Sequence, residues 1–180
     1  MKKGNIIWLN GVSSSGKTTL AKALQDVLPM PPYYISNDLF AEMIPAKYFR
    51  DAKKVAESFS MMYGTIKTFS DAGADVIVDS LFLSADRMYQ CVNELHEYPV
   101  LFVHVTCPPH ELRRREETRN DRDVGQGERQ LADLHPRDTY DIIVDTYSNS
   151  KAECADMIEE ALGCLEKFAA FKTILSQRTE

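Results

Sequence analysis

Short apolar segments alternate with longer segments of helical periodicity along this chain. Segments of three to six residues that are apolar throughout are typical of strands buried on both faces of a sheet. Five segments of this kind lie at 6–9, 33–35, 76–78, 100–105 and 142–144, with His104 as the one polar residue among them. The pattern therefore predicts five short, buried strands.

The intervening segments have apolar residues three or four positions apart, as at Leu20 and Leu24, which is typical of helices. We expect helices that end before Pro29, then at about 51–72 and 85–96, from Pro109 onward, and from about 151 to 168 or beyond. Alternation of strands and helices predicts an α/β fold, a parallel sheet with helices on both faces. Ligands of such sheets bind at the carboxyl ends of the strands.

Length and composition favour one globular domain that covers residues 1–180. The net charge of −6 makes nucleic acids and anionic membranes poor partners, although residues 113–122 are locally basic. No stretch approaches the ~20 apolar residues of a membrane span. The N-terminus has no signal-peptide pattern, and the four cysteines have no metal-binding spacing, so we expect a cytoplasmic protein.

A glycine-rich segment follows the first predicted strand and opens a helix. It contains Gly11, Val12, Ser13, Ser14, Ser15, Gly16, Lys17 and Thr18, which match G-x-x-x-x-G-K-[ST] at every fixed position. In this P-loop, the Walker A motif, backbone N–H groups surround phosphates, the lysine reaches the β- and γ-phosphates, and the hydroxyl binds Mg²⁺. The motif predicts ATP and Mg²⁺ as cofactors. Thr19 contacts the α-phosphate or serves only as a helix residue.

Acidic side chains follow two of the predicted strands. Asp79 comes directly after 76–78, where a carboxylate can hold Mg²⁺, although it could also cap a helix. Asp38 follows the second strand. Its carboxylate suits a general base for an acceptor hydroxyl, and it suits equally an N-cap for a helix that begins at Leu39.

Arginines are concentrated in the segment after the fourth strand. Arg115, Arg119 and Arg122 have the spacing i, i+4, i+7, which a helix places on one face. A triphosphate is a suitable anion for such a face, and Gly125 and Gly127 would give a closing lid at about 113–129 its flexibility. The alternative is a solvated helix with internal pairs such as Glu111 with Arg115.

These motifs together resemble the chloramphenicol phosphotransferase-like family of P-loop kinases, from Ile6 to about Leu162. The resemblance is carried by 7–18, 37–45, 78–83, Arg115 with 119–122, and His135 with 140–141 and 144–146. It implies a fold similar to the nucleoside-monophosphate kinases, with ATP as donor and a small-molecule hydroxyl as acceptor. It also implies Asp38 as the base, Arg119 and Arg122 as lid arginines, and an adenine near Asp145 and Thr146.

Two departures concern the acceptor. Ser80 occupies the position of a second acid in the chloramphenicol-modifying member, and 50–54 does not align with it. The expected activity therefore resembles that of chloramphenicol 3-O-phosphotransferase, with the acceptor open.

Two alternatives remain at this stage. A nucleoside or nucleotide kinase would need cations near the acceptor, for which Lys47, Arg50, Lys53 and Lys54 are candidates. A non-catalytic ATP-binding switch would bind ATP without turnover. The last 15 residues carry several apolar side chains, which would dock on the domain or on a second copy in a homo-oligomer.

Overall fold

A computed structural model describes residues 2–118, 123–164 and 168–178. A parallel sheet forms its centre, and within the described residues it has five strands in the order β2-β3-β1-β4-β5. The strands are β1 (Ile6–Asn10), β2 (Tyr33–Ser36), β3 (Val76–Ser80), β4 (Val100–Thr106) and β5 (Ile142–Asp145). All five predicted strands are confirmed, and so is the predicted fold class.

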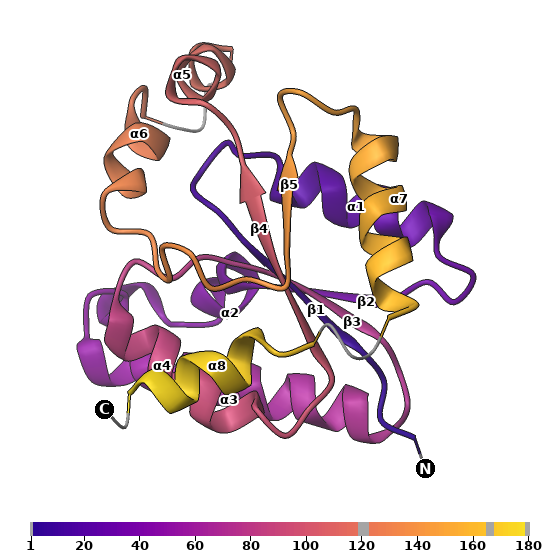
Figure 1. Cartoon of the computed structure of the whole chain (residues 1–180). Coiled ribbons are helices and arrows are strands. Elements are labelled where there is room, and N and C mark those ends of the chain that lie inside the picture. Colours follow the sequence, from indigo (N-terminus) through magenta and orange to yellow (C-terminus); the bar gives the residue numbers. More distant parts are fainter. Residues whose placement is uncertain (1, 119–122, 165–167, 179–180) are drawn as a thin grey trace.

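Helices cover both faces of the sheet (Figure 1). One face carries α1 (Lys17–Val27) and α7 (Lys151–Leu162), and the other carries α3 (Ala52–Asp71), α4 (Ala85–Leu95) and α8 (Ala170–Gln177). At the carboxyl end of the strands, α5 (Pro109–Glu117) follows β4 and packs against α6 (Gln126–Leu131). Two short elements, α2 (Asn37–Glu42) and η1 (Ala46–Tyr48), connect β2 with α3.

The central strand β1 is buried at every position because both of its faces are covered. Its side chains alternate, so that Ile6 and Trp8 join the core beneath α3, α4 and α8, whereas Ile7 and Leu9 join the core beneath α1 and α7. The Trp8 ring stacks on Phe82 at a centroid distance of 5.2 Å. This packing fixes the end of β1, from which the glycine-rich loop departs.

The C-terminal region differs from the sequence prediction. The helix expected from 151 to about 168 ends at Leu162, and a separate helix, α8, begins at Ala170. Phe171 and Ile174 of α8 are buried in the core of the chain itself. Asp141 fixes the start of α8, because its Oδ1 accepts hydrogen bonds from the N–H groups of Ala169 and Ala170. These apolar residues thus dock on their own domain.

Asn10 ties three segments together beneath the site. Its Nδ2 donates to the His135 carbonyl and to the Tyr140 hydroxyl, both at 2.8 Å, and its Oδ1 accepts from the Phe82 N–H at 3.0 Å. The side chain is fully buried. His135 and Tyr140, which the sequence singled out as family motif residues, therefore take part in a structural network.

We expect Asn10→Ala to lower the free energy of unfolding by about 2–4 kcal/mol, because three hydrogen bonds are lost and their buried partners stay unsatisfied. Urea unfolding followed by circular dichroism measures this. Asn5→Ala is the control, since its side-chain oxygen makes no hydrogen bond within the described residues. Equal stability of the two variants would contradict a structural role for Asn10.

Candidate functional site

The P-loop connects β1 to α1, as the motif predicts. Ser14 has a φ of 63° and Gly16 a φ of 99°, so the chain turns through the left-handed region twice before α1 begins at Lys17. The first N–H groups of a helix have no intrahelical acceptors and favour anions. The hydroxyls of Ser14 and Ser15 are buried and have no hydrogen-bond partner among the described residues. Such a loop fits phosphate oxygens.

Three side chains converge on Asp79 at the end of β3. The Thr18 hydroxyl donates to Asp79 Oδ2 at 2.7 Å, and the Tyr34 hydroxyl donates to the same oxygen at 3.1 Å. Lys17 Nζ lies 3.8 Å from Asp79 Oδ1 and donates to the Val12 carbonyl at 3.0 Å. The pairing of β2 with β3, in which Ser36 lies beside Asp79, brings Tyr34 to this carboxylate, whereas Lys17 and Thr18 reach it from the start of α1. Thr18 and Asp79 thus offer adjacent oxygen ligands for a hard cation.

Tyr34 is a site residue that the sequence prediction missed. Partial burial raises the pKa of its hydroxyl to about 12, and the neighbouring Asp79 carboxylate adds to the shift. The hydroxyl consequently remains a proton donor to Asp79 across the physiological range. Its position in a short apolar segment looked like that of a core residue, and only the pairing of β2 with β3 reveals the contact.

A cavity of about 330 Å³ lies at the carboxyl ends of the strands. It brings together most of the residues that the sequence proposed as a site, with additional polar residues from α6. The lining residues include Ser13, Ser14, Gly16, Lys17, Thr18, Thr19, Asp38, Asp79, Arg115, Gln126 and Gln130. The phosphate-binding motif and both strand-end acids therefore share one space.

Asp38 lies in the first turn of α2 and does not cap it. The helix begins at Asn37, and Ser36 is the N-cap, whose hydroxyl accepts from the Leu39 N–H at 3.2 Å. The alternative in which Asp38 caps a helix that begins at Leu39 is therefore wrong. Asp38 is one of the residues that line the cavity, together with the P-loop motif residues.

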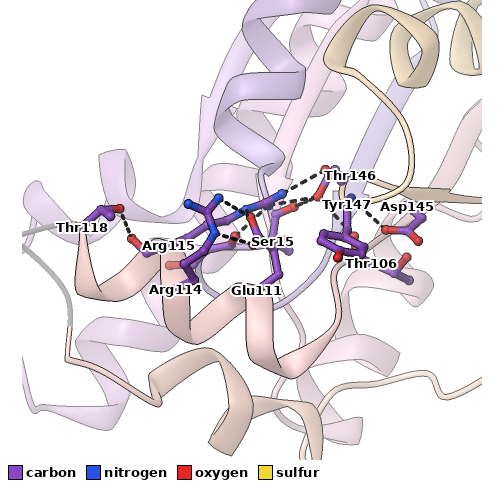
Figure 2. A network of polar contacts seen from close by, with 10 residues as sticks. Ser15, Thr106, Glu111, Arg114, Arg115, Thr118, Asp145, Thr146 and Tyr147 are labelled. Carbon is purple, nitrogen blue, oxygen red and sulfur yellow. Dashed lines mark hydrogen bonds and ion pairs between the residues drawn. The ribbon is translucent and has the colours of Figure 1, made fainter.

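The arginine-rich segment differs in part from the expectation. Helix α5 ends at Glu117, and Arg119 and Arg122 lie outside the described residues, so their roles stay predictions. The internal ion pair that the alternative interpretation proposed is present, because Arg115 Nε donates to Glu111 Oε1 at 2.8 Å, although Glu111 is buried and not solvated. Arg115 also donates to the Ser14 carbonyl of the P-loop. Figure 2 shows that it reaches Thr146 as well.

Helix α6, which the sequence did not predict, contacts the P-loop directly. Gln130 Oε1 accepts from the Ser13 N–H at 2.7 Å. A Cβ atom on Gly127 would lie 2.6 Å from the Ser13 carbonyl oxygen, so this close approach requires glycine. Glu116 is fully buried, and its carboxylate accepts from the N–H groups of Gly125 and Gly127. The two glycines expected to be flexible thus have defined contacts here.

The four candidate cations for a nucleotide acceptor lie apart from this cavity. Lys47 and Arg50 line a second hollow with residues 41–46. Lys54 Nζ pairs with Glu57 at 2.6 Å, and the N–H of Lys53 bonds to the helix cap Asp51. None of the four is among the residues that line the P-loop cavity.

Two further findings concern the described residues only. They contain no cluster of three or more His, Cys, Asp or Glu side chains that could hold a metal ion. A cation at Thr18 and Asp79 would therefore need phosphate oxygens and water as its remaining ligands, as Mg²⁺ usually has.

Within the same part of the chain, no helix has the length and apolar character to cross a membrane.

Comparisons with solved structures identify the fold. The APS kinase CysC of Mycobacterium tuberculosis, in complex with AMPPNP and APS, has a TM-score of 0.72 at 17% identity, covering 91% of this chain and 99% of that chain. The tunicamycin resistance protein of Deinococcus radiodurans has a TM-score of 0.68 at 19% identity, with coverage of 89% and 96%. A gluconokinase from Sinorhizobium meliloti has a TM-score of 0.61 at 18% identity, covering 99% of both chains.

Sequence comparisons identify the family. Two strains of Mycobacterium tuberculosis have a protein named "Putative O-phosphotransferase" that is 27% identical, covering 89% of this chain and 83% of the relative. The model of the family described as chloramphenicol phosphotransferase-like protein matches residues 4–163. The chain therefore belongs to the chloramphenicol phosphotransferase-like protein family, and it is a phosphotransferase with the fold of the P-loop kinases.

Proposed function

We propose that this phosphotransferase moves the γ-phosphate of ATP onto a hydroxyl group of a small molecule. The observation that carries the proposal is the shared cavity, which is lined both by the P-loop with Lys17 and by Asp38. Such an arrangement holds a phosphoryl donor on one side and a proton acceptor on the other. The complex of the structurally similar APS kinase with AMPPNP supports nucleotide binding by this fold.

The residues present fit ATP and Mg²⁺. The unpartnered hydroxyl of Ser14, a residue that lines the cavity, and the N-terminus of α1 suit phosphate oxygens, and Thr18 with Asp79 suits the metal. When bound, ATP supplies the transferable phosphoryl group, and Mg²⁺ neutralises charge on its β- and γ-phosphates. The segments 11–18 and Thr19 are the proposed nucleotide-binding residues.

The chain's own side chains then have distinct tasks. Lys17 donates hydrogen bonds and holds positive charge where negative charge develops. Asp38 orients the acceptor hydroxyl and takes its proton as the oxygen attacks phosphorus. Arg119 and Arg122 are proposed to contact the phosphates from the lid at about 113–129, within the single domain 1–180. The N–H groups of the P-loop fix the phosphate chain for in-line transfer.

A nucleoside or nucleotide acceptor is the second candidate. It is favoured by one observation, the hollow of about 730 Å³ lined by Lys47 and Arg50 on the connection that follows Asp38. A phosphate or other anion on the acceptor could bind these cations. Neither Lys47 nor Arg50 lines the cavity that Asp38 lines. This separation favours an acceptor that places no phosphate group next to Asp38.

An acceptor panel separates the two candidates. ADP formation is measured with ATP and Mg²⁺ in two sets, chloramphenicol and other hydroxylated antibiotics in one, nucleosides and nucleoside monophosphates in the other. We expect stimulation in the first set. Stimulation by nucleosides or nucleotides alone would replace the proposal with the second candidate, and ATP binding without stimulation by either set would favour a non-catalytic switch.

A further inference from the structure

Two carbonyl groups of the P-loop are held by side chains from other parts of the chain, and Figure 2 shows one of them, that of Ser15, beside Thr146. The Ser14 oxygen accepts a hydrogen bond from Arg115 Nη1 at 3.2 Å, and the Ser15 oxygen accepts one from the Thr146 hydroxyl at 2.6 Å. Arg115 comes from α5, and Thr146 follows β5 directly. Two segments that lie about 100 and 130 residues after the P-loop in sequence thus bind consecutive peptide groups of the motif.

The two side chains also bind each other. Arg115 Nη1 donates to the Thr146 hydroxyl oxygen at 3.0 Å, and Nη2 donates to the Thr146 carbonyl at 2.9 Å. A hydroxyl has one proton to donate, and the Ser15 oxygen at 2.6 Å is closer than the Thr106 oxygen at 3.3 Å. The proton therefore goes to Ser15, and a lone pair accepts from Arg115. The pair acts as one hydrogen-bonded unit.

The position of a carbonyl fixes the next N–H group. In a planar trans peptide, the C=O of one residue and the N–H of the next point in opposite directions. Holding the Ser15 carbonyl toward Thr146 therefore directs the Gly16 N–H the other way. The Ser14–Ser15 peptide is fixed at both ends, since the Ser15 N–H donates to the Val12 carbonyl at 3.3 Å.

The same pair packs against the glycine of the motif. Gly16 has a φ of 99°, and a Cβ atom there would lie 3.3 Å from Thr146 Cγ2 and 3.5 Å from Arg115 Nη1. Ser14, with a φ of 63°, has a conformation that residues with side chains adopt infrequently. The hydrogen bonds from Arg115 and Thr146 to the carbonyl groups of Ser14 and Ser15 stabilise this conformation.

Arg115 is itself held in place. Glu111 is buried and accepts from Arg115 Nε at 2.8 Å and from Arg114 Nε and Nη2 at 2.6 and 2.8 Å. The hydrogen bonds from Arg114 and Arg115 lower the pKa of this carboxyl from its ordinary 4.5 to about 2, so it stays ionised at neutral pH. The guanidinium of Arg115 is therefore committed to Glu111, Ser14 and Thr146.

We infer that Arg115 and Thr146 are positioning residues: by holding the carbonyl groups of Ser14 and Ser15 they fix the conformation of the P-loop, so that the Gly16 N–H points away from Thr146 and faces the nucleotide phosphates. The inference rests on the proposed function, because it requires that a nucleotide binds the loop. Arg115 thereby differs from Arg119 and Arg122, the arginines proposed to contact phosphates. Its task requires no contact with the nucleotide.

Isosteric substitutions at Thr146 test this inference. Thr146→Val removes the hydroxyl and keeps the shape, whereas Thr146→Ser keeps the hydroxyl. Affinity for ATP in the presence of Mg²⁺ is measured by isothermal titration calorimetry. We expect Thr146→Val to bind ATP about tenfold more weakly, because the Ser15 carbonyl loses its hydrogen-bond donor and Arg115 loses one of its acceptors. We expect Thr146→Ser to remain within about twofold of the wild type.

Two further variants separate positioning from general damage. Thr106→Val is the matched control, since the Thr106 hydroxyl donates to the Val144 carbonyl and not to the P-loop. It should keep wild-type affinity. Arg115→Met should weaken ATP binding by a similar factor, and the double variant with Thr146→Val should be little weaker than either single variant.

The outcomes distinguish the inference from the function on which it rests. Wild-type affinity in Thr146→Val would overturn the inference while ATP binding stands. An equal loss of ATP affinity in Thr146→Val and Thr106→Val would also overturn it, and so would a Thr146→Ser variant that binds ATP as weakly as Thr146→Val. A general disturbance of the sheet would then explain the effect. A wild-type protein that binds no ATP would overturn the proposed function, and the inference with it.

Discussion

Lys17→Met is expected to reduce phosphoryl transfer about 10³-fold or more. The Lys17 side chain is largely buried, with its ammonium group hydrogen-bonded to the P-loop carbonyl of Val12 and close to the Asp79 carboxylate. It is therefore a fixed positive charge at the proposed phosphate site, and loss of one such preorganised donor has effects of this size. The measurement is the rate of ADP formation at saturating acceptor.

Lys22→Met is the matched control for this substitution. Lys22 lies on the same helix, α1, and is exposed. We expect it to retain nearly the full rate. A Lys17→Met protein that melts at the wild-type temperature and keeps more than a tenth of the activity would contradict the role of Lys17.

Asp38→Asn is expected to lower kcat by about 10²–10⁴-fold while the affinity for ATP stays within a few-fold of the wild type. The amide keeps the size of the carboxylate and its place in the cavity, but it cannot accept the hydroxyl proton. The measurements are kcat from ADP formation and the dissociation constant of ATP from calorimetry.

Glu42→Gln provides the control, because Glu42 is an exposed acid one turn further along α2 and lies outside the P-loop cavity. Its kcat should match the wild type. If Asp38→Asn instead lost ATP binding and kept its kcat, Asp38 would be a metal ligand or a structural residue, and the general base would have to be sought elsewhere.

The sheet could be predicted because its signals are local. Each strand is a continuous apolar run, and β1 leads directly into a motif whose glycines and lysine have fixed spacing. Asp79 could be located for the same reason, since it follows the apolar residues of β3. The fold class and the family followed from these segments together.

Helix boundaries at the chain's later segments were not predictable from periodicity. Leu162 and Phe168 continue an apolar pattern, but α7 ends at Leu162 with Gly163 as its C-cap. Asp141, far away in sequence, fixes the start of α8 through a tertiary contact. Helix α5 ends at Glu117, although the charge pattern of the segment continues.

The contacts around the P-loop were beyond sequence reasoning for a similar reason. Tyr34, Gln130 and Thr146 reach Asp79, Ser13 and Ser15 only through strand pairing and the packing of α6. Each of these residue types is common in turns and helices, so none gives a signal by itself. For Thr146 the family resemblance indicated a place near the adenine, but it did not reveal the hydrogen bond to the Ser15 carbonyl.

Transfer of the γ-phosphate of ATP to a hydroxyl group is tested most directly by ³¹P NMR. The purified protein is incubated with ATP, Mg²⁺ and pooled hydroxylated acceptors, with Lys17→Met in parallel. We predict that, for the wild type, the γ-phosphate signal declines while a phosphate-monoester signal and ADP appear in equal amounts. For Lys17→Met we predict no such change. ATP that binds but stays intact with every pool, or release of inorganic phosphate without a monoester, would contradict transfer to a hydroxyl.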